Sequence, residues 1–216
     1  MERIFSLSPG NHSLLLIDYQ YLQLLTIRSH NTSSVINHVT TLSKAGKIFG
    51  IPTLVTTAFT EQKDVIREIT ELFPEQTPLD RNTMNAMEDV HVTEWIKNNG
   101  GKKLVMAGLW TEVCLQLSAL NALAAGYEVY IITDASGGAS LEDHQKAIEC
   151  MAEAGAILLT TWSYINELQD TGGQKDTADA LAKLFVEYGG TSGHGFRWDG
   201  QLRNYLLSRK VYADFV

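Results

Sequence analysis

The regular alternation of amphipathic stretches with short apolar runs constrains the fold of this chain more than any other feature of its sequence. In the second half of the chain each stretch with helical spacing is closed by Gly or Asn and is followed by an apolar run. The predicted helices are Val90–Asn98, Thr111–Ala125 and Leu141–Ala154, and the predicted strands are Lys103–Ala107, Glu128–Thr133 and Ala156–Thr161. Helices and strands that alternate through short joints predict a parallel sheet with helices on both faces.

The first half of the chain follows the same order less regularly. The expected elements are a strand at Ser13–Asp18, a helix at Ser34–Lys47, a strand at Ile51–Thr56, a short helix at Glu61–Phe73 ended by Pro74, and a strand end with a loop at Thr77–Glu88. The continuous apolar run of the first strand is typical of a strand buried on both faces. The sequence therefore predicts a three-layer α-β-α fold around a doubly wound, mainly parallel sheet.

A tail breaks the rhythm from about Glu167. It contains one good helix, Ala178–Tyr188, between two glycine-rich segments, Thr171–Gly173 and Gly189–Gly195, which are expected to be flexible joints. The predicted organisation is a domain at 1–165 and a helical extension at 166–216. The extension carries many aromatic and aliphatic side chains, so we expect it to pack on the core or on a neighbouring subunit, since disordered segments are poor in aromatics.

Composition and charge exclude several classes of protein. Lys and Arg number 17 against 25 Asp and Glu, which gives a net charge of −8 and argues against nonspecific nucleic-acid binding. No apolar run approaches the roughly 20 residues that span a bilayer, and Met1–Gly10 lacks the apolar core of a signal peptide. Two cysteines make no disulfide framework. We expect a cytoplasmic protein with a small-molecule substrate and no nucleic-acid or membrane partner.

Three reactive side chains stand at or near predicted strand ends, where a doubly wound sheet binds its ligands. Asp18 ends the first strand, and Cys114 falls in the first turn of the predicted helix Thr111–Ala125. Arg81 lies in the loop before the predicted helix Val90–Asn98. The helix start is expected to lower the pKa of the thiol, with Asp18 as its base. From these residues alone a buried core cysteine, a capping aspartate and a solvated arginine stay open.

Four motifs together resemble the isochorismatase-like cysteine hydrolase superfamily and, within it, the YcaC-type branch. They are Leu15–Gln20, Arg81 with Asn85-Ala86, Gly108–Cys114 and Ile132–Gly137, within a likeness that runs from about Ser13 to Trp162. The resemblance implies Asp18 as base, Arg81 as the basic member of the triad and Cys114 as nucleophile. It also implies a cis peptide bond between Leu109 and Trp110.

The function expected from the residues and the resemblance is a cofactor-free hydrolase that cleaves an amide-like C–N bond through a Cys114 thioester. Backbone N–H groups of Trp110 and Cys114 would hold the oxyanion, with Leu109, Trp110 and Asn85 facing the substrate. A metal-dependent amidase of the nicotinamidase kind is one alternative. Nicotinamidases carry a metal-binding cluster of Asp and His between their catalytic Asp and Lys. In this sequence the corresponding interval, between Asp18 and Arg81, holds only His30 and His38 and has no close Asp-x-His pair, so no metal site is predicted. An oligomeric binding or scaffold protein is the other alternative.

The resemblance also bears on assembly, because YcaC-type proteins form octamers of stacked rings. A homo-octamer is therefore expected, with the segment after Ala178 contributing much of the contact between subunits.

Overall fold

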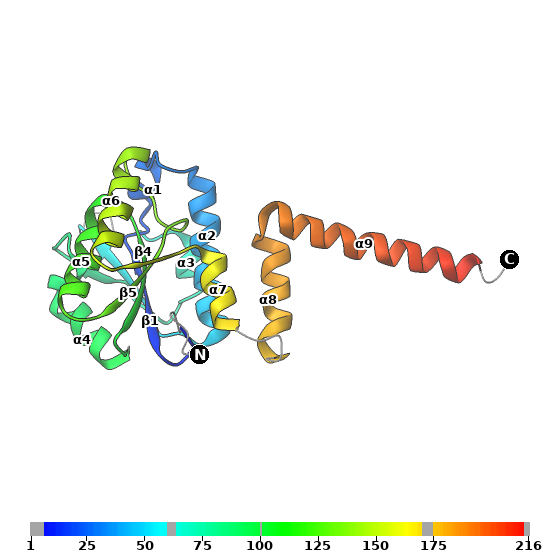
Figure 1. Ribbon diagram of the computed structural model, residues 1–216, viewed down its shortest axis with the longest axis horizontal. Helices are drawn as coiled ribbons and strands as arrows, with labels where there is room; N and C mark the ends of the chain where they lie inside the picture. The colour runs from blue at the N-terminus through cyan, green and yellow to red at the C-terminus, as the bar shows by residue number, and fades with distance from the viewer. Residues whose placement is uncertain (1–6, 60–63, 100, 170–174, 214–216) are drawn as a thin grey trace. The chain divides into compact units, whose positions relative to one another are not determined.

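The computed structural model describes residues 7–59, 64–99, 101–169 and 175–213. A parallel six-stranded sheet forms the centre of the first compact part of the chain (Figure 1). The strands are β1 (His12–Ile17), β2 (Thr53–Ala58), β3 (Leu79–Arg81), β4 (Lys103–Gly108), β5 (Glu128–Ile132) and β6 (Ile157–Leu159). Their order is β3-β2-β1-β4-β5-β6 and each described pair is parallel. The predicted fold class is confirmed.

Helices cover both faces of this sheet, with α2 and α7 on one side and α4, α5 and α6 on the other (Figure 1). Their bounds are α1 (Tyr21–Thr26), α2 (Thr32–Phe49), α3 (Arg67–Thr70), α4 (Val90–Asn99), α5 (Gln116–Ala124), α6 (Leu141–Glu153) and α7 (Thr161–Gln169). Side-chain caps fix the longer ones: Asn31 accepts from the Ser33 N–H at the start of α2, and Ser140 accepts from the Asp143 N–H in α6.

The central strand β1 explains how the fold brings the candidate site together. Its residues are buried on both faces, as the apolar run predicted. It pairs with β4 so that Ile17 lies opposite Gly108, which places the two strand ends at the same edge of the sheet. A Cβ atom on Gly108 would lie 2.7 Å from the Ile17 Cβ, so only glycine allows this close approach.

Three local predictions differ from the structure. The strand expected at Ala156–Thr161 ends at Leu159, and α7 begins at Thr161, whose N–H and hydroxyl both donate to Asp134. The helix expected at Glu61–Phe73 is reduced to α3 in the described residues; residues 61–63 lie outside them. Helix α1 was not expected, because six residues are too few to establish a helical period.

The chain divides after α7 rather than at residue 165. Residues up to 169 form one compact unit and those from 175 form another. Helix α7 belongs to the first unit because Tyr164, Ile165 and Leu168 are buried there.

The second unit consists of α8 (Lys175–Tyr188) and α9 (Gly190–Ala213). The segment Gly189–Gly195 was expected to be a flexible joint, but it starts α9; the joint expected at Thr171–Gly173 lies outside the described residues. A Cβ on Gly193 would lie 2.3 Å from the carbonyl oxygen of Phe185, so its glycine permits a tight helical corner. Large apolar side chains are exposed along α9: Phe196, Trp198, Leu202, Tyr205, Leu206 and Leu207.

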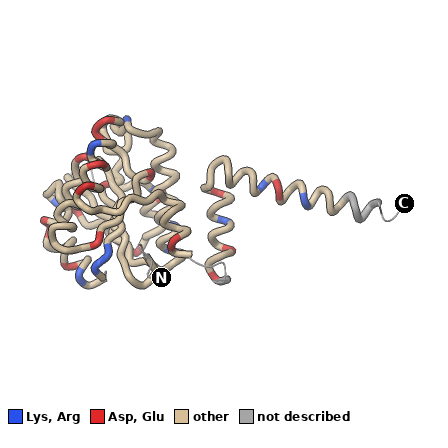
Figure 2. Tube along the Cα trace, viewed as in Figure 1, with Lys and Arg blue, Asp and Glu red and all other residues tan. Residues whose placement is uncertain are grey.

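Residues of both charge signs are mixed along the described chain (Figure 2). Lys and Arg are interspersed with Asp and Glu rather than gathered into a basic stripe of the kind that binds nucleic acid. None of the helices described is both long and apolar enough to cross a bilayer.

A buried histidine at the start of β1 makes the stability of the fold depend on pH. His12 donates from Nδ1 to the Ser8 carbonyl (2.9 Å) and accepts at Nε2 from the Tyr164 hydroxyl (2.7 Å), so it is held neutral. Burial lowers its pKa from 6.5 to about 4. Between these values the unfolded chain binds more protons, so the free energy of unfolding falls as pH falls.

We expect this histidine to remove about 2 kcal/mol of stability between pH 7 and pH 5. Denaturant unfolding at the two pH values measures it, and His12→Gln should show a correspondingly smaller loss. His91→Gln, at an exposed position, is the control and should keep the wild-type pH dependence. Equal pH dependence in His12→Gln and wild type would contradict the assignment.

Candidate active site

The candidate site lies at the point where the winding of the sheet reverses. The chain leaves β1 toward β2 and β3, and later returns to place β4 on the other side of β1. Ligands bind at such a switch point, beyond the carboxyl ends of the strands. Asp18 follows β1 directly, and Cys114 follows β4 in a π-helical turn, Thr111–Leu115. Arg81 ends β3.

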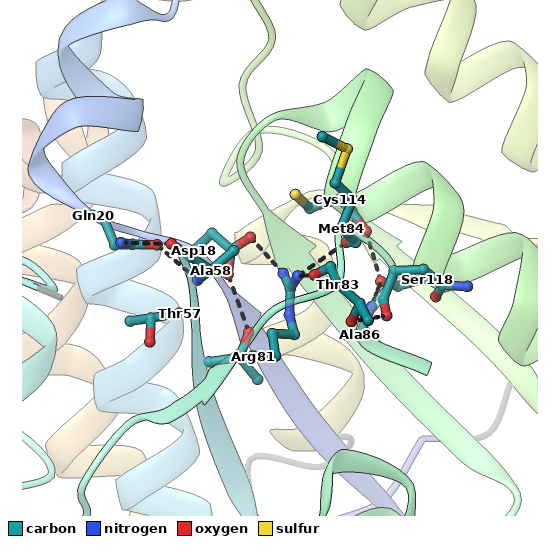
Figure 3. Close-up of polar contacts among 12 residues, drawn as sticks. Asp18, Gln20, Thr57, Ala58, Arg81, Thr83, Met84, Ala86, Cys114 and Ser118 are labelled. Atoms are coloured by element: carbon teal, nitrogen blue, oxygen red, sulfur yellow. Dashed lines mark hydrogen bonds and ion pairs between the residues drawn. The ribbon is translucent and has the colours of Figure 1, made fainter. Parts of the chain in front are cut away.

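Asp18 and Arg81 form a buried ion pair (Figure 3). Arg81 Nη2 lies 2.5 Å from Asp18 Oδ2, and the two side chains are 0% and 1% exposed. Thr56 donates to the other carboxylate oxygen at 3.3 Å. Asp18 has a φ of 59°, in the left-handed region that aspartate tolerates better than most residues.

Burial raises the pKa of Asp18 because an ionised carboxylate is poorly solvated inside the protein. The Arg81 charge and hydrogen bonds from Cys114, Arg81 and Thr56 act in the opposite direction, but burial outweighs them. A carboxyl group with a raised pKa is a better proton acceptor than an ordinary aspartate. Asp18 is therefore suited to act as a base.

The environment of Cys114 corrects the expectation of a lowered thiol pKa. Cys114 is 5% exposed, and burial together with the neighbouring Asp18 charge raises the pKa of its thiol to about 12, although Arg81 acts to lower it. Burial is the largest of these effects, and the sequence pattern at the start of a helix does not reveal it. At neutral pH Cys114 is a thiol beside a base, not a preformed thiolate.

Arg81 also fastens the loop that follows β3. Its Nη1 donates to the carbonyl oxygens of Thr83 and Met84, and its Nε has no hydrogen-bond partner among the described residues. Asn85 accepts from the Met87 N–H and donates to Glu88. Both polar groups of the Asn85 side chain are thus hydrogen-bonded within the turn that contains it, and its contact with substrate stays a prediction.

The cis peptide bond between Leu109 and Trp110 is present as the resemblance implied. Leu109 is fully buried and donates its N–H to the Ile17 carbonyl, so its side chain belongs to the core. The half-buried Trp110 donates from its indole N–H to Thr26 in α1. Thr111 donates its N–H to Gly137. These hydrogen bonds hold in position the backbone of residues 109–111, where the Cys114 turn begins.

His30 and His38, the two histidines considered as metal ligands, contact residues other than Asp18, Arg81 and Cys114. His38 donates to the Asp134 carbonyl, and the ring of His30 packs edge-on against that of His144 at 4.6 Å. Within the described ranges, no group of three or more His, Cys, Asp or Glu side chains is placed to hold a metal ion.

A cavity of about 710 Å³ opens beside His30 and His144 at the ends of β5 and β6. None of the three triad residues lines it. His144 joins this region to the Cys114 turn, because its Nδ1 lies 2.9 Å from the Thr111 hydroxyl. Burial lowers the pKa of His144 to about 4, so it is neutral at physiological pH.

Sequence reasoning missed Thr56 and Ser118. Thr56 contacts Asp18 from the next strand, which only the register of β1 and β2 reveals. Ser118 lies four residues after Cys114, a spacing that places both on one face of a helix. This four-residue spacing could have identified Ser118 from the sequence as a neighbour of Cys114.

Comparison with known proteins identifies the family of this chain. The isochorismatase domain profile matches residues 12–163. The chain is 30% identical over 185 residues to the probable hydrolase YcaC of Escherichia coli, covering 84% of this chain and 88% of that protein.

Two solved structures show the same fold. The YcaC structure from Escherichia coli, described as an octameric hydrolase of unknown specificity, superimposes with a TM-score of 0.87 at 27% identity over 94% of this chain and 99% of that chain. YcaC from Pseudomonas aeruginosa, solved with hexane-2,5-diol and covalent acrylamide, gives a TM-score of 0.81 at 25% identity over 95% and 99%. This chain belongs to the isochorismatase family of hydrolases, in its YcaC-type branch.

Proposed function

We propose that this protein is a cysteine hydrolase that cleaves an amide-like C–N bond of a small molecule through a thioester on Cys114. The observation that carries the proposal is the buried arrangement of a thiol, a carboxylate with a raised pKa and an arginine at one switch point. Nucleophilic catalysis needs a nucleophile, a base beside it and a group that stabilises the charge that moves between them.

The charges of the site suit this reaction. In the resting site one negative charge, on Asp18, faces the positive charge of Arg81. When Asp18 takes the thiol proton, the negative charge moves to sulfur and still faces Arg81. Arginine keeps its proton throughout, so its role is electrostatic.

The reaction then proceeds in two halves. The Cys114 sulfur attacks the carbonyl carbon, and the carbonyl oxygen becomes an oxyanion held by the backbone N–H groups of Trp110 and Cys114. The C–N bond breaks, and the leaving amine takes the proton from Asp18. Water, deprotonated by Asp18, attacks the thioester, releases the acid and returns the proton to sulfur.

A relative supports the choice of a reactive probe. YcaC from Pseudomonas aeruginosa was solved with covalent acrylamide. A thiol adds its sulfur to the terminal carbon of acrylamide while the neighbouring carbon takes the proton, so a reactive Cys114 with a base beside it is expected to form a covalent adduct with this reagent. The other cysteine, Cys150, is half-buried on α6, outside the turn that carries Cys114.

The function is tested by screening small amides and nitriles while following the intact protein by mass spectrometry. We expect at least one amide to give an acyl adduct that maps to Cys114 and disappears as product forms. Adducts confined to Cys150, or hydrolysis without any covalent intermediate, would overturn the thioester mechanism. Hydrolysis that requires an added divalent metal would favour the nicotinamidase kind.

We also propose that the protein acts as a homo-octamer in the cytoplasm. The Escherichia coli relative is octameric, and α9 exposes a run of large apolar side chains that an isolated chain would leave in water.

Light scattering is expected to give a mass several times the 23.9 kDa of one chain at micromolar concentration. Removing the chain after Asp170 is expected to reduce the assembly, because it deletes α8 and α9. The truncated protein is compared with wild type by circular dichroism to show that the first unit stays folded. A full-length chain near 24 kDa, or a truncated chain with unchanged mass, would contradict this proposal.

A further inference from the structure

Ser118 connects the two segments that carry the reactive groups. Its hydroxyl donates to the Cys114 carbonyl at 2.6 Å and accepts from the Ala86 N–H at 2.9 Å (Figure 3). Ser118, on α5, and Ala86, at the start of the short helix after β3, are both fully buried. One side chain therefore bridges the Cys114 turn and the loop that follows Arg81.

The same loop is held at its other end by Arg81. The guanidinium donates to the Thr83 and Met84 carbonyls while it pairs with Asp18. Thr83 in turn donates from its hydroxyl to the Asn85 carbonyl. These hydrogen bonds link Arg81 to Ser118 through a short loop.

We propose that Ser118 is a positioning residue that sets the placement of Arg81 relative to the Cys114 sulfur. This inference rests on the proposed function of the triad but assigns a residue that the triad does not include. Arg81 acts to lower the pKa of Cys114, and that effect depends on how closely the guanidinium is held. Ser118 holds the backbone of the Cys114 turn to the backbone of the loop after Arg81, and in this way it maintains the distance between the guanidinium and the sulfur.

Ordinary helix packing does not explain the bridge. A serine that bonds back to the carbonyl four residues earlier is common in helices and stabilises them little. Ser43 makes the same bond to the Val39 carbonyl in α2 at 2.7 Å, and it is equally buried. Ser118 differs because its oxygen also accepts a backbone N–H from another segment.

The test compares Ser118→Ala with Ser118→Thr and with the matched control Ser43→Ala in the full-length protein. The rate of acrylamide addition to Cys114 is measured against pH by mass spectrometry. Ser118→Ala is expected to react at least tenfold more slowly at neutral pH, with its profile displaced to higher pH because Arg81 is held less closely. Ser118→Thr keeps the hydroxyl and should restore both rate and profile.

The control separates positioning from general loss of stability. Ser43→Ala should stay within twofold of wild type in rate, whatever its melting temperature. Wild-type rate and profile in a folded Ser118→Ala protein would overturn the inference and leave the proposed function intact.

A second measurement is independent of the chemistry of Cys114. Hydrogen exchange at the Ala86 amide is expected to be slow in wild type and at least tenfold faster in Ser118→Ala. If wild-type Cys114 does not react with acrylamide, the proposed function fails, and unchanged exchange at Ala86 in Ser118→Ala would refute the bridge as well.

Discussion

Replacing Cys114 by alanine is expected to abolish hydrolysis and acrylamide addition while leaving the chain folded. Loss of the nucleophile should lower turnover by at least about a thousandfold, since only binding and oxyanion stabilisation remain. The substitution removes one sulfur atom from a buried site and no backbone hydrogen bond. Turnover and the melting temperature, measured on the same preparation, check the two parts of this expectation.

Cys150→Ala is the matched control for this prediction. Cys150 is the other free cysteine, and it lies half-buried on α6. Its substitution is expected to cost some stability and to leave turnover within twofold of wild type. Activity within tenfold of wild type in Cys114→Ala would exclude the cysteine mechanism.

Replacing Asp18 by asparagine is expected to lower turnover and the pKa of Cys114 together. Without the base, turnover should fall by roughly 10²–10⁴-fold. Because the Asp18 charge acts to raise the pKa of Cys114 while Arg81 acts to lower it, removing the carboxylate should let the thiolate form at lower pH than in wild type. The ultraviolet absorbance of the thiolate, titrated against pH with the Cys114→Ala protein as blank, measures this shift.

The same substitution leaves Arg81 as an unpaired buried charge, which costs about 3–5 kcal/mol of stability. Denaturant unfolding should accordingly show a large loss in Asp18→Asn. Asp80→Asn is the control: this neighbouring carboxylate on β3 accepts from the Thr57 hydroxyl and does not belong to the triad (Figure 3 shows Thr57). A higher pKa of Cys114 in Asp18→Asn would contradict the electrostatic account of the site.

The wild-type pH dependence follows from the same pKa directions. Asp18 must be ionised to accept the thiol proton, and its raised pKa places that requirement above the range of an ordinary aspartate. Activity should therefore rise with pH as Asp18 loses its proton. The Cys114 pKa of about 12 predicts no second rise near neutrality from a free thiolate.

Local sequence patterns were sufficient to predict the order of the main strands and helices and the strand ends at which chemistry is possible. The apolar run that ends in Asp18 and the repeated pattern from Val90 onward are local features, so no tertiary information was needed to interpret them. Irregular segments were interpreted less well. Helix α1 is too short to show a period, and glycines at Gly189–Gly195 resemble a joint although they form a helical corner.

The electrostatics of the site could not be predicted from local patterns, because they depend on the folded arrangement of distant residues. From sequence the helix start at Cys114 predicted a lowered thiol pKa, but the folded chain buries the thiol beside Asp18, and both burial and the Asp18 charge raise that pKa. Burial and charge depend on residues distant in sequence: Arg81 reaches Asp18 across β2, and Ser118 reaches Ala86 from another helix. Periodicity reports which face of an element is buried, whereas a pKa depends on what lies opposite that face.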